Sequence, residues 1–202
     1  MDLVIATGNK GKLAEIQELL LPLNFNCQAQ SELNIESAEE TGLTFIENAI
    51  LKARHAAKLS GKPALADDSG LVVPALKGAP GIYSARYAGE NATDQQRYEK
   101  LLQEMKAFSG DDRQAYFVCA LAYLQHAEDP APVIAQGLWH GKLLTAPRGE
   151  NGFGYDPIMY IPGLNQGVAE MAAELKNRHS HRSKAIQLFF KQILPHSSES
   201  TL

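Results

Sequence analysis

The stretch Leu65-Ala66-Asp67-Asp68-Ser69-Gly70 places two adjacent carboxylates, a hydroxyl and a glycine directly after a short apolar run. This pattern predicts a buried strand that ends in a tight turn. Neighbouring carboxylates repel each other and are costly to bury unless a cation or hydrogen-bond donors compensate them. Two interpretations therefore stay open for the stretch alone: a solvated turn in which Asp67 caps the backbone, and a functional acid pair.

The chain has 202 residues with a formal charge of −4 at pH 7, and 45% of its residues are hydrophobic. These values are typical of one medium-sized globular domain or two joined lobes. The negative charge argues against a nucleic-acid partner, so an anionic ligand needs a local positive site. No apolar run approaches the roughly 18 residues of a membrane helix and no signal peptide is recognisable, so we expect no membrane partner. Cys27 and Cys119, far apart in apolar surroundings, predict buried thiols in a cytoplasmic protein.

A glycine-rich loop, Thr7-Gly8-Asn9-Lys10-Gly11-Lys12, follows a predicted strand at Leu3–Ala6 and precedes a helix that Pro22 ends. A strand, a glycine loop and a helix N-terminus together present free backbone N–H groups to an anion. The loop is not a Walker A loop, because Leu13 stands where Ser or Thr is required, and it lacks the G-x-G-x-x-G spacing. Its spacing alone fits a plain strand-to-helix turn and a phosphate site equally well.

An acidic turn, Glu39-Glu40-Thr41-Gly42, comes before the next predicted helix. Thr44 and Glu47 form a capping box at the start of that helix, and Gly61 stands where its C-cap belongs. Lys52 borders the apolar face of the helix. A lysine in that place most often only extends its ammonium to solvent.

A second glycine-rich segment, Gly149–Pro157, follows the predicted central strand Tyr116–Leu124 and a further strand at Val133–Leu144. Three glycines around Phe153 allow the backbone to approach a ligand closely and present the ring as a stacking platform. A glycine-rich hairpin loop without a ligand explains the same residues equally well. The last predicted helix ends at Pro195. We expect one domain over residues 1–195, with residues 196–202 as a frayed C-terminal tail.

Seven motifs, some of them described above, follow one another along the chain. They are TGNKGK at Thr7–Lys12, EETG at Glu39–Gly42, FIENAILK at Phe45–Lys52, ADDSG at Ala66–Gly70, GAPGIYSARY at Gly78–Tyr87, GFGYDP at Gly152–Pro157, and Lys176 followed by Ser180-His181-Arg182. Together they resemble the inosine-triphosphate pyrophosphatase family. The resemblance implies an α/β fold, with a mixed twisted sheet, flanking helices and two lobes around a nucleotide-binding cleft. Two positions depart from the family pattern, Met159 in place of Phe and Ser183 in place of Gly.

The resemblance also implies a role for each matching residue. Glu40 and Asp68 become the Mg²⁺ ligands, and Asp68 also the base that takes a proton from water. The phosphate contacts it implies are Thr7, Gly8, Asn9, Lys10, Gly11, Lys12, Lys52 and Ser69. The purine contacts it implies are Phe153, Gly154, Tyr155, Asp156, His181 and Arg182, and Lys176 reaches the ligand as well, as one of three lysines with Lys12 and Lys52 that suit the triphosphate charge.

The implied activity is Mg²⁺-dependent hydrolysis of non-canonical purine nucleoside triphosphates, namely ITP, dITP and XTP, to the monophosphate and pyrophosphate. Cleavage of the α–β anhydride needs neutralised phosphate charge, a metal and an activated water. Lysines neutralise the phosphate charge, and paired carboxylates bind the metal and accept a proton from the water. The resemblance further implies a homodimer. Two alternatives stay open: a non-catalytic nucleotide binder, and a related pyrophosphatase for pyrimidine or modified nucleotides.

Overall fold

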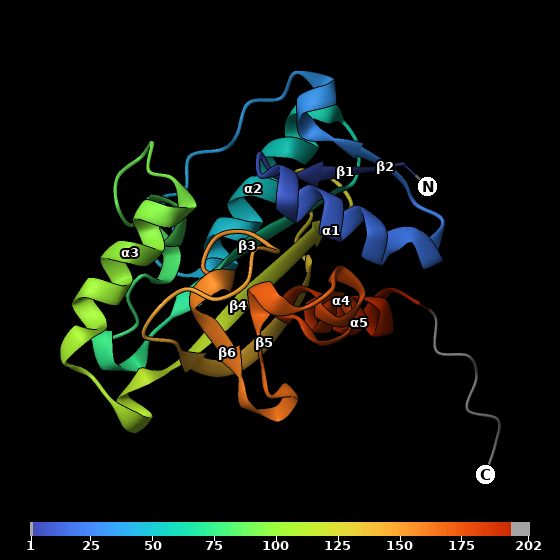
Figure 1. Ribbon diagram of the computed structural model, residues 1–202. Coiled ribbons are helices and arrows are strands. Elements are labelled where there is room, and N and C mark those ends of the chain that lie inside the picture. The colour runs from blue at the N-terminus through green and yellow to red at the C-terminus, as the bar shows by residue number, and fades with distance from the viewer. Residues whose placement is uncertain (1, 195–202) are drawn as a thin grey trace, which may run out of the picture. The chain divides into compact units, whose positions relative to one another are not determined.

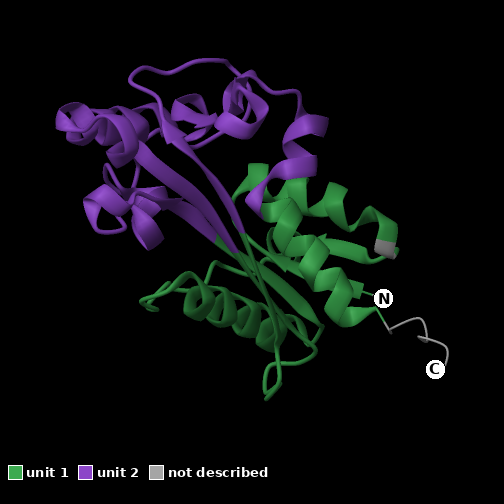
Figure 2. Cartoon of the chain, turned by 90° about the horizontal axis from the view of Figure 1, so that it is seen from below, with its two compact units in different colours: residues 1–68, 120–137, 182–202 green, residues 69–119, 138–181 purple. Residues whose placement is uncertain are grey.

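The computed structural model describes residues 2–194, and these residues divide into two compact units (Figure 2). Unit 1 contains residues 2–68, 120–137 and 182–194, and unit 2 contains residues 69–119 and 138–181. The predicted tail at residues 196–202 lies outside the described residues, and the single domain over residues 1–195 stays a prediction. No helix within residues 2–194 has the length and apolar character needed to cross a bilayer.

Seven strands form one mixed sheet in the order β2-β1-β3-β4-β5-β6-β7 (Figure 1). Their bounds are β1 Asp2–Ala6, β2 Asn26–Ala29, β3 Ala64–Val72, β4 Gln114–Leu124, β5 Val133–Leu143, β6 Met159–Ile161 and β7 Gln166–Gly167. β1 runs parallel to β2 and β3, whereas β6 runs antiparallel to β5 and β7. The predicted α/β fold with a mixed sheet is confirmed, and the run predicted to be central forms β4, the middle strand.

The α-helices are α1 Lys10–Leu20, α2 Phe45–Ser60, α3 Asp94–Glu104, α4 Ala173–His179 and α5 His181–Ile193. In unit 1, α2 covers one face of the strands and α1 and α5 cover the other (Figure 2). Successive side chains of a strand point to opposite faces, so each strand serves both layers. Val4 and Ala66 pack with the alanines of α2, whereas the Tyr123 ring on the other face lies 5.6 Å from that of Phe189 in α5.

The predicted ends of α2 are confirmed. The Thr44 hydroxyl accepts a hydrogen bond from the Glu47 N–H, and Gly61 ends the helix with a φ of +66°. The side of α2 that faces the strands is built from four buried alanines, Ala49, Ala53, Ala56 and Ala57. Small side chains let the helix lie close to the sheet, so residues on α2 can reach groups on β3.

The core of unit 2 gathers side chains from its strands and from α3. Leu71, Leu101, Phe117 and Trp139 are buried together in it. Met159, which departs from the family pattern, belongs to the same cluster and is fully buried. The core therefore accommodates methionine at this position. An unbranched, polarizable side chain fits irregular spaces of this kind.

The predicted turn at the acid pair is wrong, because β3 continues as one strand from Ala64 to Val72. Asp67 and Asp68 lie within that strand and are 0% and 5% exposed. The turn prediction rested on the interruption of an apolar run by Asp-Asp-Ser-Gly. In the structure cationic side chains from α1, α2 and α5 compensate the carboxylates, and the strand has no reason to end.

Three smaller expectations also need correction. Lys10 already belongs to α1, with Asn9 as its N-cap, because the Asn9 side chain accepts the Lys12 N–H. Residues 39–42 form an irregular extended segment rather than a turn. Cys119 is buried as predicted, but Cys27 is only half-buried because it lies in β2 at the edge of the sheet.

Candidate functional site

The acid pair of β3 lies beside the loop that follows β1. Ala6, the last residue of β1, pairs with Ala66 in parallel register. Asp67 and Asp68 therefore stand level with Thr7 and the loop between β1 and α1. The carboxyl ends of adjacent parallel strands are where open α/β sheets bind their ligands. Consecutive strand residues point to opposite faces, so the two carboxylates face different layers of unit 1.

Asp67 faces α1 and α5 and takes part in a ladder of alternating charges. Its Oδ1 lies 2.9 Å from Lys12 Nζ, and its Oδ2 accepts a hydrogen bond of 2.8 Å from Arg182 Nε. Arg182 in turn pairs with Glu15, which is on α1 three residues after Lys12. Asp67 and Arg182 are 0% and 1% exposed. Each buried charge therefore has an opposite charge beside it, which offsets its loss of hydration.

The start of α1 stands directly beside this ladder. Asn9 caps the helix, and the Thr7 hydroxyl accepts the Asn9 N–H at 3.2 Å. The first turn of a helix carries backbone N–H groups and the positive end of the helix dipole. Gly8 and Lys10 are exposed, whereas Thr7 is buried. A helix N-terminus of this kind is able to bind an anion, and Lys12 lies in the first turn of the helix.

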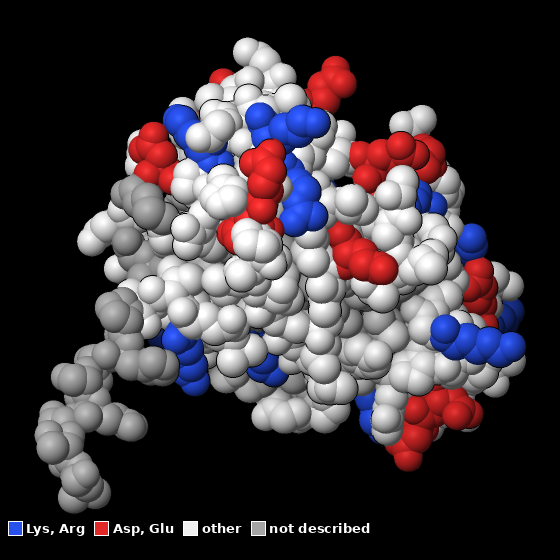
Figure 3. All heavy atoms as spheres, turned by 180° about the vertical axis from the view of Figure 1, so that it is seen from behind, with Lys and Arg blue, Asp and Glu red and all other residues white. Residues whose placement is uncertain are grey.

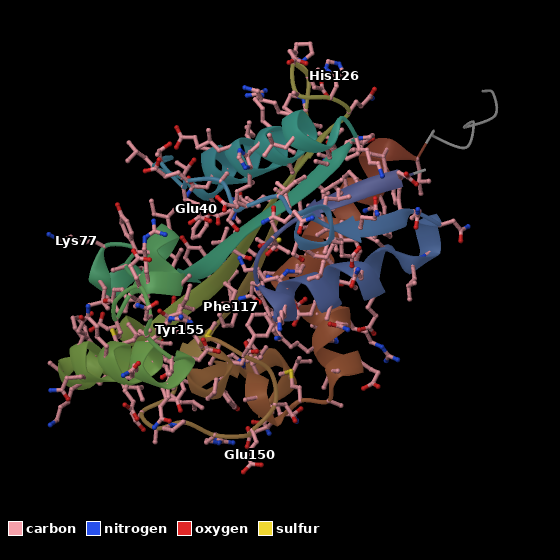
Figure 4. The ribbon with its side chains drawn as sticks, turned by 90° about the horizontal axis from the view of Figure 1, so that it is seen from above. Glu40, Lys77, Phe117, His126, Glu150 and Tyr155 are labelled. Atoms are coloured by element: carbon pink, nitrogen blue, oxygen red, sulfur yellow. The ribbon has the colours of Figure 1, made fainter. Side chains whose placement is uncertain are left out.

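Asp68 faces α2, where Lys52 binds two carboxylates at once. Lys52 Nζ lies 2.7 Å from Asp68 Oδ1 and 2.9 Å from Glu40 Oε1. Glu40, labelled in Figure 4, belongs to the segment that precedes α2 in the sequence. Burial alone lowers the pKa of the Lys52 ammonium, but Asp68 and Glu40 raise it above its ordinary value. Burial raises the pKa of Asp68, and the nearby lysines offset part of that rise.

Asn48 belongs to this cluster and was missed in the sequence. It is fully buried on α2, where its Oδ1 accepts the Gly42 N–H at 2.8 Å and its Nδ2 donates to Asp68 Oδ2 at 3.4 Å. A Cβ at Gly42 would overlap Glu47 and Asn48, so only glycine lets the segment with Glu40 approach α2. The available signal was an amide on the apolar face of a predicted helix, since a buried amide needs partners.

The two carboxylates that share Lys52 fit a magnesium ion better than a zinc ion. Within the described residues no group of three or more His, Cys, Asp or Glu side chains gathers as a metal site. Magnesium keeps several waters and commonly takes only one or two carboxylates together with phosphate oxygens. Glu40 and Asp68 provide such a pair, and oxygen donors suit a hard cation.

The glycine-rich segment of unit 2 is organised by Asp156. The Asp156 Oδ2 accepts the Phe153 N–H at 2.9 Å and pairs with Lys176 Nζ at 2.6 Å, and both charged groups are buried. The Lys176 ammonium also lies 4.5 Å from the centre of the Phe153 ring, within the range of a cation–π contact. A Cβ at Gly152 would overlap the Asp156 carboxylate, which explains that glycine.

Two further contacts hold the same segment. The Gly154 N–H donates to Asp94 Oδ2 at 2.6 Å, and the buried Tyr155 hydroxyl donates to the Ser84 carbonyl at 2.9 Å. Burial raises the pKa of the Tyr155 phenol. His181, also in unit 2, stacks on Phe117 with ring centres 5.0 Å apart.

The structure thus brings the predicted residues together in two groups, one in each unit. Those of unit 1 are Thr7, Gly8, Asn9, Lys10, Gly11, Lys12, Glu40, Lys52, Asp68 and Arg182. Those of unit 2 are Ser69, Phe153, Gly154, Tyr155, Asp156, Lys176 and His181. Their contacts with a substrate or a metal stay predictions.

A model of the Ham1 family matches residues 3–192. This chain belongs to the Ham1 family. The match includes both groups of site residues, and it confirms the family resemblance read from the motifs.

Relatives in the Ham1 family carry a named activity. The dITP/XTP pyrophosphatase of Photorhabdus laumondii is 59% identical over 185 residues, which are 92% of this chain and 94% of that protein. The dITP/XTP pyrophosphatase of Vibrio cholerae is 54% identical over 191 residues, which are 95% and 96% of the two chains.

Solved Ham1 structures share the fold. A HAM1 protein from Coxiella burnetii superposes with a TM-score of 0.88 at 49% identity, covering 95% of this chain and 98% of that one. The Ham1 protein of Staphylococcus aureus gives a TM-score of 0.84 at 42% identity, covering 95% and 97%. The mixed sheet with flanking helices is therefore the fold of this Ham1 family.

Proposed function

We propose that this chain is a nucleoside triphosphate pyrophosphatase that hydrolyses ITP, dITP and XTP to the monophosphate and pyrophosphate. The observation that carries the proposal is the buried acid pair beside the N-terminus of α1, with Lys12 and Lys52 bound to its two carboxylates. Anion-binding N–H groups, cations and acidic side chains are what cleavage of a metal-bound triphosphate requires. The names of the Photorhabdus and Vibrio relatives support two of these substrates, dITP and XTP.

In this proposal the phosphate contacts are the loop at residues 7–9, the first turn of α1, the two lysines and the hydroxyl of Ser69. The loop at residues 7–9 and the first turn of α1 offer backbone N–H groups, and Lys12 and Lys52 offer compact positive charges. Because both lysines pair with carboxylates, their charges are already directed toward the acid pair. A phosphate group bound there shares the lysines with Asp67 and Asp68.

The proposed cofactor is Mg²⁺, held by Glu40 and Asp68. When bound, such an ion neutralises phosphate charge and lowers the pKa of a coordinated water. Asp68 would accept the proton of the attacking water. Asn48 and Lys52 hold its two oxygens in place.

The proposed purine contacts include the Phe153 ring, which would stack on the base. Hypoxanthine and xanthine carry an acceptor oxygen at position 6, where adenine carries an amino donor. N–H donors such as those of His181 and Arg182 therefore favour hypoxanthine and xanthine over adenine. A site built on such bonds rejects a base without the acceptor by up to about 10⁴-fold. We therefore expect ATP to be a very poor substrate.

Arg182 stays a proposed base contact, with one structural condition. Its guanidinium is buried and bonded to Asp67 through Nε and to Glu15 through one Nη, so a base in contact with it must reach the other N–H groups of the guanidinium. Comparison of kcat/KM for ITP and for ATP in Arg182→Ala tests this contact.

We further propose that the chain acts as a homodimer in the cytoplasm and has no nucleic-acid partner. The dimer rests on the family resemblance. On the face shown in Figure 3, blue and red side chains alternate and do not gather into a basic stripe, as the formal charge of −4 leads one to expect. A monomer mass in solution at micromolar protein would contradict the dimer.

The deciding experiment is a screen of nucleoside triphosphates with and without Mg²⁺ that measures pyrophosphate and orthophosphate separately. Pyrophosphate from ITP, dITP and XTP, dependent on Mg²⁺, is the expected result. Release of orthophosphate alone would refute the assignment of pyrophosphatase activity. Tight binding of ITP without any product would favour the alternative of a non-catalytic nucleotide binder. Turnover of pyrimidine nucleotides would favour the alternative of a related pyrophosphatase that acts on them.

A further inference from the structure

The segment at residues 152–156 is tied to its unit through three consecutive residues. Gly154 donates its N–H to Asp94 at the start of α3, Tyr155 donates its hydroxyl to the Ser84 carbonyl, and Asp156 pairs with Lys176 of α4. Tyr155 is 5% exposed, and Figure 4 labels it. A phenol whose hydroxyl already donates to a buried carbonyl is placed to hold the segment rather than to bind a ligand.

Ser84 connects this segment to β3. Its buried hydroxyl accepts the Leu71 N–H at 2.9 Å and donates to the Gly81 carbonyl at 2.6 Å. A hydroxyl has one donor and two acceptor positions, so both bonds form at the same time. Ser84 thus holds the segment Gly81–Arg86 on β3 through its side chain and holds Tyr155 through its carbonyl.

The glycine at position 70 makes this contact possible. A Cβ on Gly70 would overlap the Ser84 hydroxyl and the Gly81 carbonyl. Gly70 directly follows Ser69, the proposed phosphate contact, and directly precedes Leu71. The motif GAPGIYSARY, which the proposed chemistry leaves without a role, therefore supplies the link between β3 and the base-binding segment.

We propose that Tyr155 and Ser84 are positioning residues, which together hold the Phe153 platform in register with β3. This inference rests on the proposed function, because it assigns the positioned ring to purine binding. Holding a binding loop in its bound conformation lowers the entropy lost on binding and so raises affinity. The Tyr155 side chain then acts through Phe153 and its neighbours, whereas the sequence predicted that it contacts the purine.

The test is Tyr155→Phe, which removes one hydroxyl and no ring, with Tyr160→Phe as the matched control. Tyr160 is in the same unit, and its hydroxyl donates to Asn165 at 2.6 Å, away from Ser84. We expect the KM for ITP to rise roughly 3- to 10-fold in Tyr155→Phe, the equivalent of one hydrogen bond, with kcat changed by less than about twofold. Inorganic triphosphate, which has no base, is expected to inhibit both variants as it does the parent.

A second measurement does not depend on turnover. Hydrogen exchange of the ligand-free proteins is expected to quicken for the amides at residues 152–156 in Tyr155→Phe and not in Tyr160→Phe. Unchanged exchange in Tyr155→Phe would show that the tether, the link from Tyr155 through Ser84 to β3, does not hold the segment in place. Faster exchange with an unchanged KM, or an equal loss of inorganic triphosphate binding, would overturn the positioning of the base platform. A parent protein that releases no pyrophosphate from ITP would instead refute the proposed function, and exchange would still decide the tether.

Ser84→Ala tests the other half of the link. It removes the hydroxyl that holds Leu71 and leaves the carbonyl that Tyr155 uses. If both residues act through one tether, the double variant with Tyr155→Phe raises the KM for ITP no further than the stronger single variant. A KM effect equal to the product of the two single effects would refute the shared tether.

Discussion

Replacing Asp67 by Asn separates the role of Asp67 in the acid pair from that of Asp68, the proposed base. Asp67 has no exposed surface and lies between Lys12 and Arg182, and the Arg182 side chain is 1% exposed. Asparagine keeps the size and one acceptor oxygen but removes the negative charge between two cations. Arg182 then keeps Glu15 as its described carboxylate partner.

The expected loss of stability follows from this burial. Removing one partner of a buried ion pair typically costs about 3–5 kcal/mol, and the oxygen retained by Asn places this variant near 3 kcal/mol. For a chain of this length each kcal/mol lowers Tm by roughly 2–4 °C, so we expect a Tm lower by about 6–12 °C. Urea unfolding at pH 7 measures the loss directly, provided that the m-value stays that of the parent.

Asp111→Asn is the matched control, because its carboxylate pairs with Lys142 at 3.0 Å and its side chain is 83% exposed. Exposed pairs contribute little and are screened by salt, so this variant is expected to unfold like the parent. Equal unfolding midpoints for Asp67→Asn and Asp111→Asn would refute the argument that the ladder around Asp67 is a buried electrostatic unit.

Four other substitutions test the proposed chemistry. Asp68→Asn is expected to lower kcat at least about 100-fold while ITP still binds, because it removes the base; near-normal kcat would rule that role out. Glu40→Gln is expected to raise the Mg²⁺ concentration needed for half-maximal rate, and a titration identical to that of the parent would show that Glu40 binds no metal. Lys12→Ala is expected to weaken triphosphate binding by roughly tenfold, and more at low salt than at high salt. If the variant bound triphosphate as tightly as the parent at every ionic strength, Lys12 would have no role in phosphate binding. Arg182→Ala is expected to lower kcat/KM for ITP more than for ATP, and an unchanged ratio would assign Arg182 to the buried ladder alone.

Local structure was largely determined by the sequence. The ends of α2 follow from Thr44, Glu47 and Gly61, since capping and a left-handed C-cap depend only on neighbouring residues. The central strand follows from an uninterrupted apolar run, and the order of the motifs identifies the family without any coordinates. Each of these properties is encoded within a few residues, or in a list of motifs, and needs no knowledge of distant contacts.

Only the tertiary structure decided what happens at the acid pair. From the sequence, Asp-Asp-Ser-Gly after an apolar run predicted a turn, and the partners of the two carboxylates could not be identified. Their partners come from other elements: Lys12 from α1, Lys52 from α2, and Arg182 from α5, which is 115 residues from Asp67. Tertiary packing supplied these cations, and the strand could then continue through the pair.

The same reason separates the predicted site residues from their observed contacts. Tyr155 was assigned to the substrate by its motif, but its hydroxyl bonds to the carbonyl of Ser84, 71 residues earlier in the chain. Asn48 was passed over because its partners, Gly42 and Asp68, meet it only when α2 packs on β3. A motif specifies which side chains are available. Which of them pair with each other, and which are left to meet a ligand, is set by burial, since a polar group removed from water must find its partner wherever the fold places one.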